Sequence, residues 1–401
     1  MSEVSPGPER APQGIAAIAG LAIDQKMVAW LELFYDLVFA AATLILSIAA
    51  SKAHGAGMTL LWLALTFSAL WWIWLSTAMF ANRYRVYDLP QRVLVVLQML
   101  FVAVVAIEAQ AGAIRDDRSL ATAFGILLAS IATMYFRERG RPDPSGSFAR
   151  KMAATYGLGA LLFLLDAPLP GVVRGWLGLL FLVIAVVPVI IRVARQRGVP
   201  PIDEGHLVER MGAFTIIVLG ETFVKVAIAV SVHRVTYLDL GTLFIQVVMT
   251  FALFATYFED IPHAGLQPRR LGVWTSLHLV MQIALVAVAI GVSKLIELKP
   301  PDHLTDTQTV EIIVSLTIIY LALMGISWAT RRRPIGQLNA LRLATAWVIA
   351  SIGAVTWSFT SIYLDETLPF IMAAMIATAI ISRHVLKSTL VEPRGDLLET
   401  A

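Results

Sequence analysis

The chain has 401 residues, of which 58% are hydrophobic and only 15% are charged, and its formal net charge is +3. Soluble domains carry about 25% charged residues, so a mean hydropathy of +0.76 and repeated apolar runs predict an all-α, polytopic membrane protein. Cysteine is absent, which excludes disulfides, thiolate metal sites and cysteine nucleophiles.

The first stretch, residues 1–27, is rich in Pro and Gly and lacks the layout of a signal peptide. We expect a disordered cytoplasmic tail there. About twelve apolar segments follow, and each is expected to span the membrane as a helix. They run roughly over 28–50, 58–81, 91–113, 119–136, 149–166, 172–195, 207–231, 238–258, 271–296, 308–330, 339–363 and 367–385.

The segments suggest a duplication. At an offset of 184 residues, 94–107 aligns with 278–291 and matches Gln98 to Gln282, and at 185 Asp36 faces Glu221. We therefore predict two six-helix halves of the same orientation, 28–195 and 207–388, related by an axis along the membrane normal. Residues 196–206 would be the linker, and 389–401 a second cytoplasmic tail.

The basic residues indicate the orientation. If the N-terminus is cytoplasmic, the cytoplasmic side holds 23 of the 31 Lys and Arg and the opposite side holds seven. Cytoplasmic loops of membrane proteins are enriched in Lys and Arg. The split predicts that both termini are cytoplasmic.

The stretch WLELFYDLVF, residues 30–39, opens the first apolar segment with two carboxylates. Residues four apart share a helix face, so Glu32 and Asp36 would point the same way. Thr43 and Ser47 fall near them at 3.6 residues per turn. The first helix is therefore predicted to carry a polar stripe, and ionisable groups inside a membrane indicate function by default.

The second half has its own cluster in residues 205–226. Glu209 and Arg210 lie at the cytoplasmic end of the seventh segment, and Glu221 lies roughly 20 Å along that helix. Lys225 follows one turn later, the favourable order for a helical ion pair. Asp36 and Glu221 are the candidate proton or substrate carriers, and Lys225 is a candidate either to tune Glu221 or to bind an anionic group of a substrate.

Ion pairing that only locks helices together is the alternative for these charges. Glu32 and Glu209 each have Arg83, Arg210 and Arg342 as candidate partners. For Asp36, Glu221 and Lys225 we favour function, since a buried ion pair is rarely more stabilising than an apolar replacement.

Two further polar residues, His278 and Gln282, form one face of the ninth segment. They are candidate substrate or proton ligands, although a hydrogen-bonded contact between helices is the favoured reading of such a histidine. For the tryptophans of the second segment we favour lipid-facing and interfacial packing over the wall of a cavity.

Outside these stripes, Glu259, Asp260 and His263 cluster at a cytoplasmic end, where a solvated loop is favoured over a metal site. Glu311 is expected to be solvated. No metal, cofactor or nucleic-acid partner is expected. The expected partners are the lipid bilayer and an unidentified small molecule.

Two stretches carry a family resemblance: Glu32 to Phe39, and Glu209-Arg210 followed by Leu219-Gly220-Glu221. They resemble the hallmarks of the bacterial low-temperature-requirement A (LtrA) proteins, and the resemblance covers the membrane region. It implies a multipass protein of the bacterial cytoplasmic membrane and favours Glu32, Asp36, Glu209, Arg210 and Glu221 as functional residues. It supplies no substrate.

The leading hypothesis is a proton-coupled secondary transporter of a small solute. Asp36 and Glu221 would carry the proton, and Glu32, Glu209, Arg210 and Arg83 would gate it or lock helices. No phosphate loop, G-x-S-x-G or H-E-x-x-H is present, so an enzyme is the second reading. It would act on a lipidic or isoprenoid substrate, with a buried carboxyl as general acid. A non-catalytic membrane scaffold of the stress response is the third.

Overall fold

A computed structural model of the full chain provides the structure. It describes residues 13–52, 56–86, 88–110, 118–168, 199–231, 237–261, 265–297, 303–330, 335–359 and 363–391. The predicted segment 172–195 and His263 lie outside these residues. The prediction of about twelve spans is therefore neither confirmed nor contradicted in that part of the chain.

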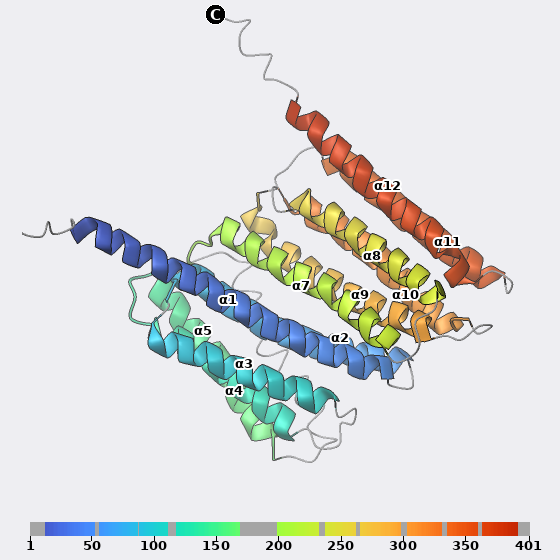
Figure 1. Ribbon diagram of the computed structural model, residues 1–401. Coiled ribbons are helices and arrows are strands. Elements are labelled where there is room, and N and C mark those ends of the chain that lie inside the picture. The colour runs from blue at the N-terminus through green and yellow to red at the C-terminus, as the bar shows by residue number, and fades with distance from the viewer. Residues whose placement is uncertain are drawn as a thin grey trace, which may run out of the picture.

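The described residues form eleven α-helices and one short 3-10 helix, and no strand occurs among them (Figure 1). This confirms the predicted all-α class. The helices are α1 (Gln13–Lys52), α2 (Ala56–Tyr84), α3 (Leu89–Gln110), α4 (Arg118–Arg137), α5 (Ser145–Asp166), α7 (Glu204–Ser231), α8 (Tyr237–Phe258), α9 (Leu271–Glu297), α10 (Asp306–Trp328), α11 (Ile335–Ser358) and α12 (Leu364–Val391), with η2 (Pro268–Arg270) before α9.

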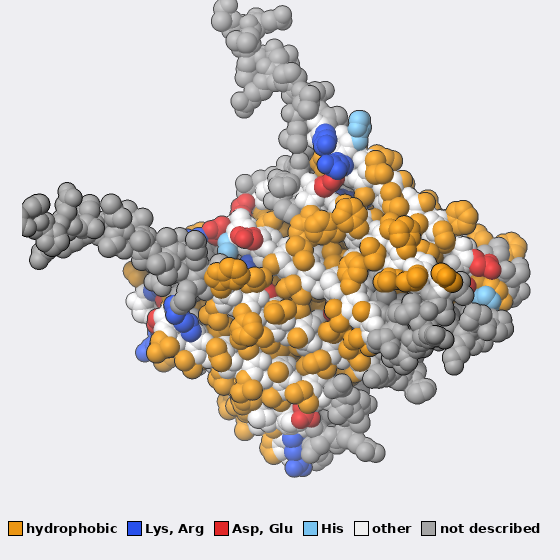
Figure 2. Space-filling view, viewed as in Figure 1, with side chains coloured by type: hydrophobic (Ala, Val, Ile, Leu, Met, Phe, Trp, Pro, Cys, Tyr) orange, Lys and Arg blue, Asp and Glu red, His pale blue; other side chains and the backbone are white. Residues whose placement is uncertain are grey.

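Ten of the described helices are long and apolar enough to cross a membrane. Large apolar side chains stay exposed on their outer faces, among them Phe251, Trp347 and Phe370. Figure 2 shows hydrophobic side chains over the middle of the viewed face and charged ones mainly toward the ends of the helices. An apolar surface of this size is stable only against lipid, so the chain is a multipass membrane protein.

Helix α1 runs through the centre of the assembly beside α7, and the two are parallel (Figure 1). On one side α1 packs on α3, α3 on α4, and α4 on α5. On the other side α7 packs on α9, α9 on α10, and α10 on α11. The two neighbour series resemble each other, and the duplication stays a prediction.

Helix α1 begins at Gln13, well before residue 28 where the sequence placed its start. The extra residues include the run Gly14–Ile23, which is rich in Ala, Leu and Ile. Ala and Leu are strong helix formers, which explains why the helix extends into the stretch expected to be a tail.

The tryptophans of α2 correct a second expectation. Trp71 and Trp74 are buried within the bundle, so the favoured reading of lipid-facing packing is wrong for them. Trp71 donates from Nε1 to Oε1 of Gln282 on α9 at 2.7 Å, and Trp74 donates to Asp36 on α1. Their indole N–H groups need acceptors when buried, and the polar residues of α1 and α9 supply them.

Asp260 also differs from expectation. It follows the end of α8 but is buried, because Arg342 of α11 reaches it with Nη2 at 2.9 Å and Ser327 donates to it at 3.0 Å. Arg342 is itself fully buried. This ion pair ties α8, α10 and α11 together, and the solvated loop expected at Asp260 is wrong.

The absence of cysteine allows a direct test of the predicted orientation. Arg139, after α4, and Tyr237, at the start of α8, are both exposed and are predicted to lie on opposite sides of the membrane. We expect a membrane-impermeant maleimide to label Tyr237→Cys in intact cells and Arg139→Cys only after permeabilisation. The reverse pattern would contradict cytoplasmic termini.

Candidate functional site

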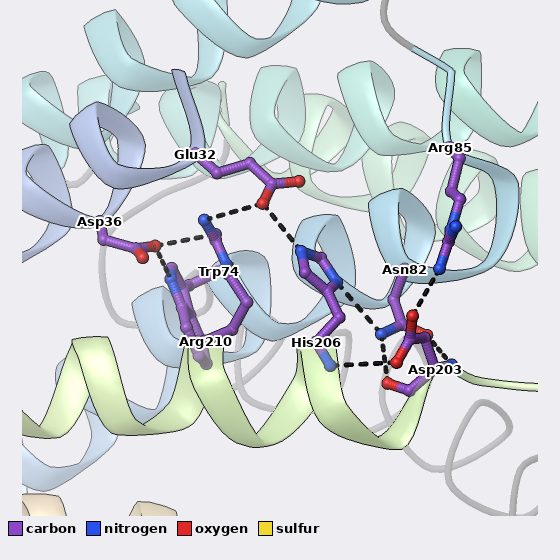
Figure 3. Close-up of polar contacts among 8 residues, drawn as sticks. All are labelled: Glu32, Asp36, Trp74, Asn82, Arg85, Asp203, His206 and Arg210. Atoms are coloured by element: carbon purple, nitrogen blue, oxygen red, sulfur yellow. Dashed lines mark hydrogen bonds and ion pairs between the residues drawn. The ribbon is translucent and has the colours of Figure 1, made fainter. Parts of the chain in front are cut away.

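The interface between α1 and α7 carries matched pairs of charged or polar residues. Glu32 and Asp36 lie one turn apart on α1, and His206 and Arg210 lie one turn apart on α7 (Figure 3). Because the helices are parallel, the pairs meet in register. Nε2 of His206 is 2.9 Å from Oε2 of Glu32, and Nη2 of Arg210 is 2.8 Å from Oδ1 of Asp36.

Asp36 is the most enclosed acid of this group, with 1% of its surface exposed. Besides Arg210, it accepts a hydrogen bond of 2.6 Å from Nε1 of Trp74. The guanidinium carbon of Arg210 lies 5.9 Å from the centre of the Trp74 ring. Charge-assisted hydrogen bonds are about twice as strong as neutral ones, so the contacts with Arg210 and Trp74 fix the position of the Asp36 carboxyl group.

Arg210 also lies close to a second acid, Glu32. Its Nη1 lies 3.6 Å from Oε2 of Glu32, which is an ion-pair distance but too long for a hydrogen bond. Nε and Nη1 are buried, and neither has a hydrogen-bond partner among the described residues. The guanidinium is therefore bound firmly to Asp36 and loosely to Glu32.

The first turn of α7 is tied to the end of α2. Asn82 donates from Nδ2 to the carbonyl of Asp203 at 2.9 Å and accepts from the amide of Asp203 at 2.9 Å (Figure 3). Asp203 in turn caps α7, because its Oδ1 accepts from the amide of His206 at 3.1 Å. That amide, followed by the nearby Arg85 guanidinium, lowers the pKa of the Asp203 carboxyl.

The same network assigns the histidine tautomer. Since Oδ1 of Asn82 accepts from the amide of Asp203, its Nδ2 group must face Nδ1 of His206, 3.2 Å away. Nδ1 is then the acceptor, and the ring proton sits on Nε2, where it is donated to Glu32.

A second acid–base pair lies deeper along the same interface. Glu221 and Lys225 are both buried, and Nζ of Lys225 lies 3.5 Å from Oε1 of Glu221. Thr43 donates to Oε2 of Glu221 at 3.1 Å, and Ser47 donates to Oε1. The structure thus brings the predicted stripe of α1 to the acid of α7. Nζ of Lys225 makes no hydrogen bond among the described residues.

Two further charged residues, from α9 and α10, lie near Lys225 of α7. Glu311 of α10 and Lys294 of α9 are within electrostatic reach of Lys225, and they lie 3.8 Å from each other. Glu311 is buried. The expectation that it would be solvated is wrong, because α9 and α10 enclose it beside Lys294.

We call the following residues the α1–α7 seam: Glu32, Asp36, Thr43 and Ser47 on α1, and His206, Arg210, Glu221 and Lys225 on α7. A cavity of about 30 Å³ touches the seam at Glu32 and Arg210 and is also lined by Tyr35 and Thr77. One water needs about 10–15 Å³ on this measure. The end of the seam at Glu32 and Arg210 therefore has room for water, whereas Asp36 does not line the cavity.

His278 and Gln282 of α9 lie beside the seam but are occupied by other contacts. Nδ1 of His278 donates to the carbonyl of Trp274 at 2.8 Å, which leaves Nε2 to accept from the hydroxyl of Tyr257 at 3.0 Å. Gln282 accepts from Trp71 and donates to Thr215 at 3.3 Å. These bonds fit a role in holding helices together.

The remaining gate candidates lie away from the seam. Glu209 is exposed on α7. Arg83 turns toward α5, with its guanidinium carbon 5.5 Å from the centre of the Phe148 ring. Of the basic residues weighed as partners of Glu32, the structure brings only Arg210 to it.

Sequence reasoning missed His206, Asn82 and Asp203. The signal for His206 was present, because it precedes Arg210 by the same four residues that separate Glu32 from Asp36. Asn82 and Asp203 lie far apart in the chain and have no such spacing. Among the described residues, no group of three or more His, Asp and Glu side chains is placed to hold a metal ion.

A family model, that of the bacterial low temperature requirement A protein (LtrA), matches residues 27–381. The chain belongs to the LtrA family. The matched range contains every residue of the α1–α7 seam, so the seam is part of the LtrA region of this chain.

A curated relative has been matched as well. This LtrA chain is 27% identical over 251 residues to uncharacterized protein RA0937 of Rhizobium meliloti (strain 1021). The match covers 59% of each protein, so the chain spans about three fifths of that relative's length. Neither the name of the family nor that of the relative indicates a substrate or a reaction.

The ion pair between Asp36 and Arg210 can be measured by a double-mutant cycle. Removing one partner of a buried pair costs about 3–5 kcal/mol, so Asp36→Asn and Arg210→Gln should each lower the free energy of unfolding. The double variant should lose clearly less than the sum. Unfolding of the purified protein in detergent measures all three.

The control cycle uses Glu259 and Arg383, whose side chains are 3.4 Å apart at a more exposed site. Such pairs contribute about 0–1 kcal/mol. Equal coupling energies in the two cycles would contradict the special role of the buried pair.

The cap of α7 gives a local prediction. Asn caps a helix as well as Asp does, whereas Ala costs about 0.5–2 kcal/mol. Asp203→Ala should therefore speed hydrogen exchange of the first turn of α7, and Asp203→Asn should leave it nearly unchanged. Both variants lose the Arg85 ion pair, so equal effects would show that this pair, rather than the cap, orders the turn.

Proposed function

We propose that this LtrA protein is a proton-coupled secondary transporter in which the α1–α7 seam carries the proton. The observation that supports this most directly is the seam itself. Two buried acid–base pairs, Asp36–Arg210 and Glu221–Lys225, follow each other along two parallel helices.

The energetics of burial support a functional role for these pairs. A charge at the centre of a bilayer costs about 2.5–3.5 kcal/mol on insertion scales, and a buried pair is often no more stable than apolar residues of the same size. Helix packing alone does not require them. Each pair also leaves buried donors without hydrogen-bond partners among the described residues, at Arg210 and Lys225.

The arrangement supports a sequence of steps for the proton. Water in the cavity beside Glu32 and Arg210 would deliver a proton to Glu32. If Glu32 passes this proton to Asp36, the negative charge moves to Glu32, and Arg210 would follow it from Asp36 to Glu32. A buried carboxyl without a cation favours the protonated form, so Asp36 would keep the proton. Glu221 would repeat the exchange with Lys225 deeper in the membrane.

The structure corresponds in this proposal to an occluded state, because Asp36 and Glu221 are both paired and neither lines the cavity at Glu32. The pairing also fits the second candidate, a scaffold whose acids only hold α1 and α7 together. The enzyme reading has less support. A larger cavity of about 80 Å³, lined by Trp71 and Trp72, holds no carboxylate from the described residues that could act as general acid.

A pH-jump experiment separates a proton carrier from a scaffold. Protein in vesicles on a solid-supported membrane should give a transient current when the external pH falls, since a proton moves to a carboxylate inside the membrane. We expect Asp36→Asn and Glu221→Gln to reduce this current at least about tenfold, because neither amide binds a proton.

The control is Glu366→Gln, at an exposed acid in the first turn of α12, which should retain the wild-type current. A wild-type current equal to that of protein-free vesicles would reject proton transport. Thermal unfolding of each variant in detergent shows whether a lost current reflects a lost fold.

A further inference from the structure

A second cavity lies on the other side of α2 from the seam. Its volume is about 80 Å³, several times the roughly 10–15 Å³ that one water needs. Helices α2, α4 and α5 line one side, and the start of α9 lines the other. By the distribution of basic residues, these helix ends belong to the predicted cytoplasmic side.

The walls of this cavity are mostly apolar. Trp71 and Trp72 come from α2, and Phe148, Met152 and Tyr156 from α5. Aromatic and thioether side chains offer large, polarisable contact surfaces. The walls therefore suit an apolar body better than a sugar or a hydrated ion.

Most hydroxyl groups of the lining are already used inside the protein. Tyr156 donates to Ser76 at 2.7 Å, and Ser76 donates to the carbonyl of Trp72 at 2.6 Å. Thr275 donates to the carbonyl of Leu271 at 3.0 Å. These groups stabilise the walls and leave their donors unavailable to a ligand.

Two buried side-chain atoms of the lining residues have no hydrogen-bond partner among the described residues, and both are donors. They are Nε of Arg83 and Nε1 of Trp72, and both atoms are buried. Buried donors left without an acceptor lower stability. The lining therefore leaves these two donors without an acceptor, which a ligand would bring.

Arg83 also lacks a counter-charge within the described residues. Its described contacts are the ring of Phe148, the hydroxyl of Tyr135 and a long hydrogen bond of 3.5 Å from Nη1 to the carbonyl of Met79. None of these groups is a carboxylate. A guanidinium binds carboxylate and phosphate with paired, charge-assisted hydrogen bonds, so an anionic ligand is the natural complement.

We propose that this cavity binds an amphiphile with an oxyanion head, either a carboxylate or a phosphate. The head lies on Arg83 and Trp72, and the apolar body lies against Trp71, Phe148 and Met152. The cavity is partly open, so a longer chain extends out of it. The proposal does not depend on proton transport by the seam.

Octanoate and anionic phospholipid present this chemistry from two different sources. In the first arm, octanoate is titrated calorimetrically into the full-length protein in phosphatidylcholine nanodiscs, with empty nanodiscs as blank. In the second arm, native mass spectrometry of protein purified in detergent detects bound phosphatidylglycerol. A signal in the first arm alone assigns a water-borne amphiphile, and in the second alone a membrane lipid.

The variants test the donors. Arg83→Gln should weaken binding at least about tenfold, since it removes a charge-assisted contact. Trp72→Phe keeps an aromatic side chain in the wall but removes the indole N–H, and should weaken binding severalfold. Arg139→Gln, at an exposed arginine on the same predicted side, should leave binding unchanged.

Octyltrimethylammonium has a similar chain but a cationic head, and it should not bind. The proposal is overturned if neither arm shows binding. It is also overturned if the cation binds as well as octanoate, or if both Arg83→Gln and Trp72→Phe bind as the wild type does. Because Trp72→Phe keeps an aromatic wall and leaves Arg83 in place, the test stands even if Arg83→Gln does not fold.

Discussion

The ion pair between Asp36 and Arg210 fixes how α1 lies against α7. Lipid tails are as apolar as the outer faces of the helices, so the hydrophobic effect does not favour one helix neighbour over another in a membrane. Close packing and polar contacts must therefore specify the register. A slide of one turn would separate Arg210 from Asp36 and Glu32 from His206 at the same time. The seam therefore has one register, and the helices on either side of α1 and α7 are placed by it.

Helix α2 separates two different environments. On one side Trp74 and Asn82 bond to α1 and to the start of α7, and on the other side Arg83 faces α5. Asn82 and Arg83 are neighbours in the chain and point about 100° apart on the helix. A shift of α2 would therefore change the seam and the aromatic cavity together.

The polar groups of the membrane region fall into two kinds. Gln98, His278 and Gln282 have their donors and acceptors filled by neighbouring helices. Arg210, Lys225 and Arg83 keep buried donors without hydrogen-bond partners among the described residues. Satisfied networks rigidify a structure, whereas unsatisfied ones call for another explanation. This contrast supports a scaffold role for the first group and places the second at the proposed sites.

The sequence by itself determined the all-α membrane class, the family and the shared helix face of Glu32 and Asp36, because hydropathy and i, i+4 spacing are local properties. It also predicted the stripe of Thr43 and Ser47. It did not determine which residues pair across neighbouring helices. Only the tertiary structure decided that Glu32 and Asp36 meet His206 and Arg210, that Asp260 is buried, and that Arg83 faces an aromatic cavity. These contacts join residues that lie far apart in the chain, and their geometry is set by how the helices pack.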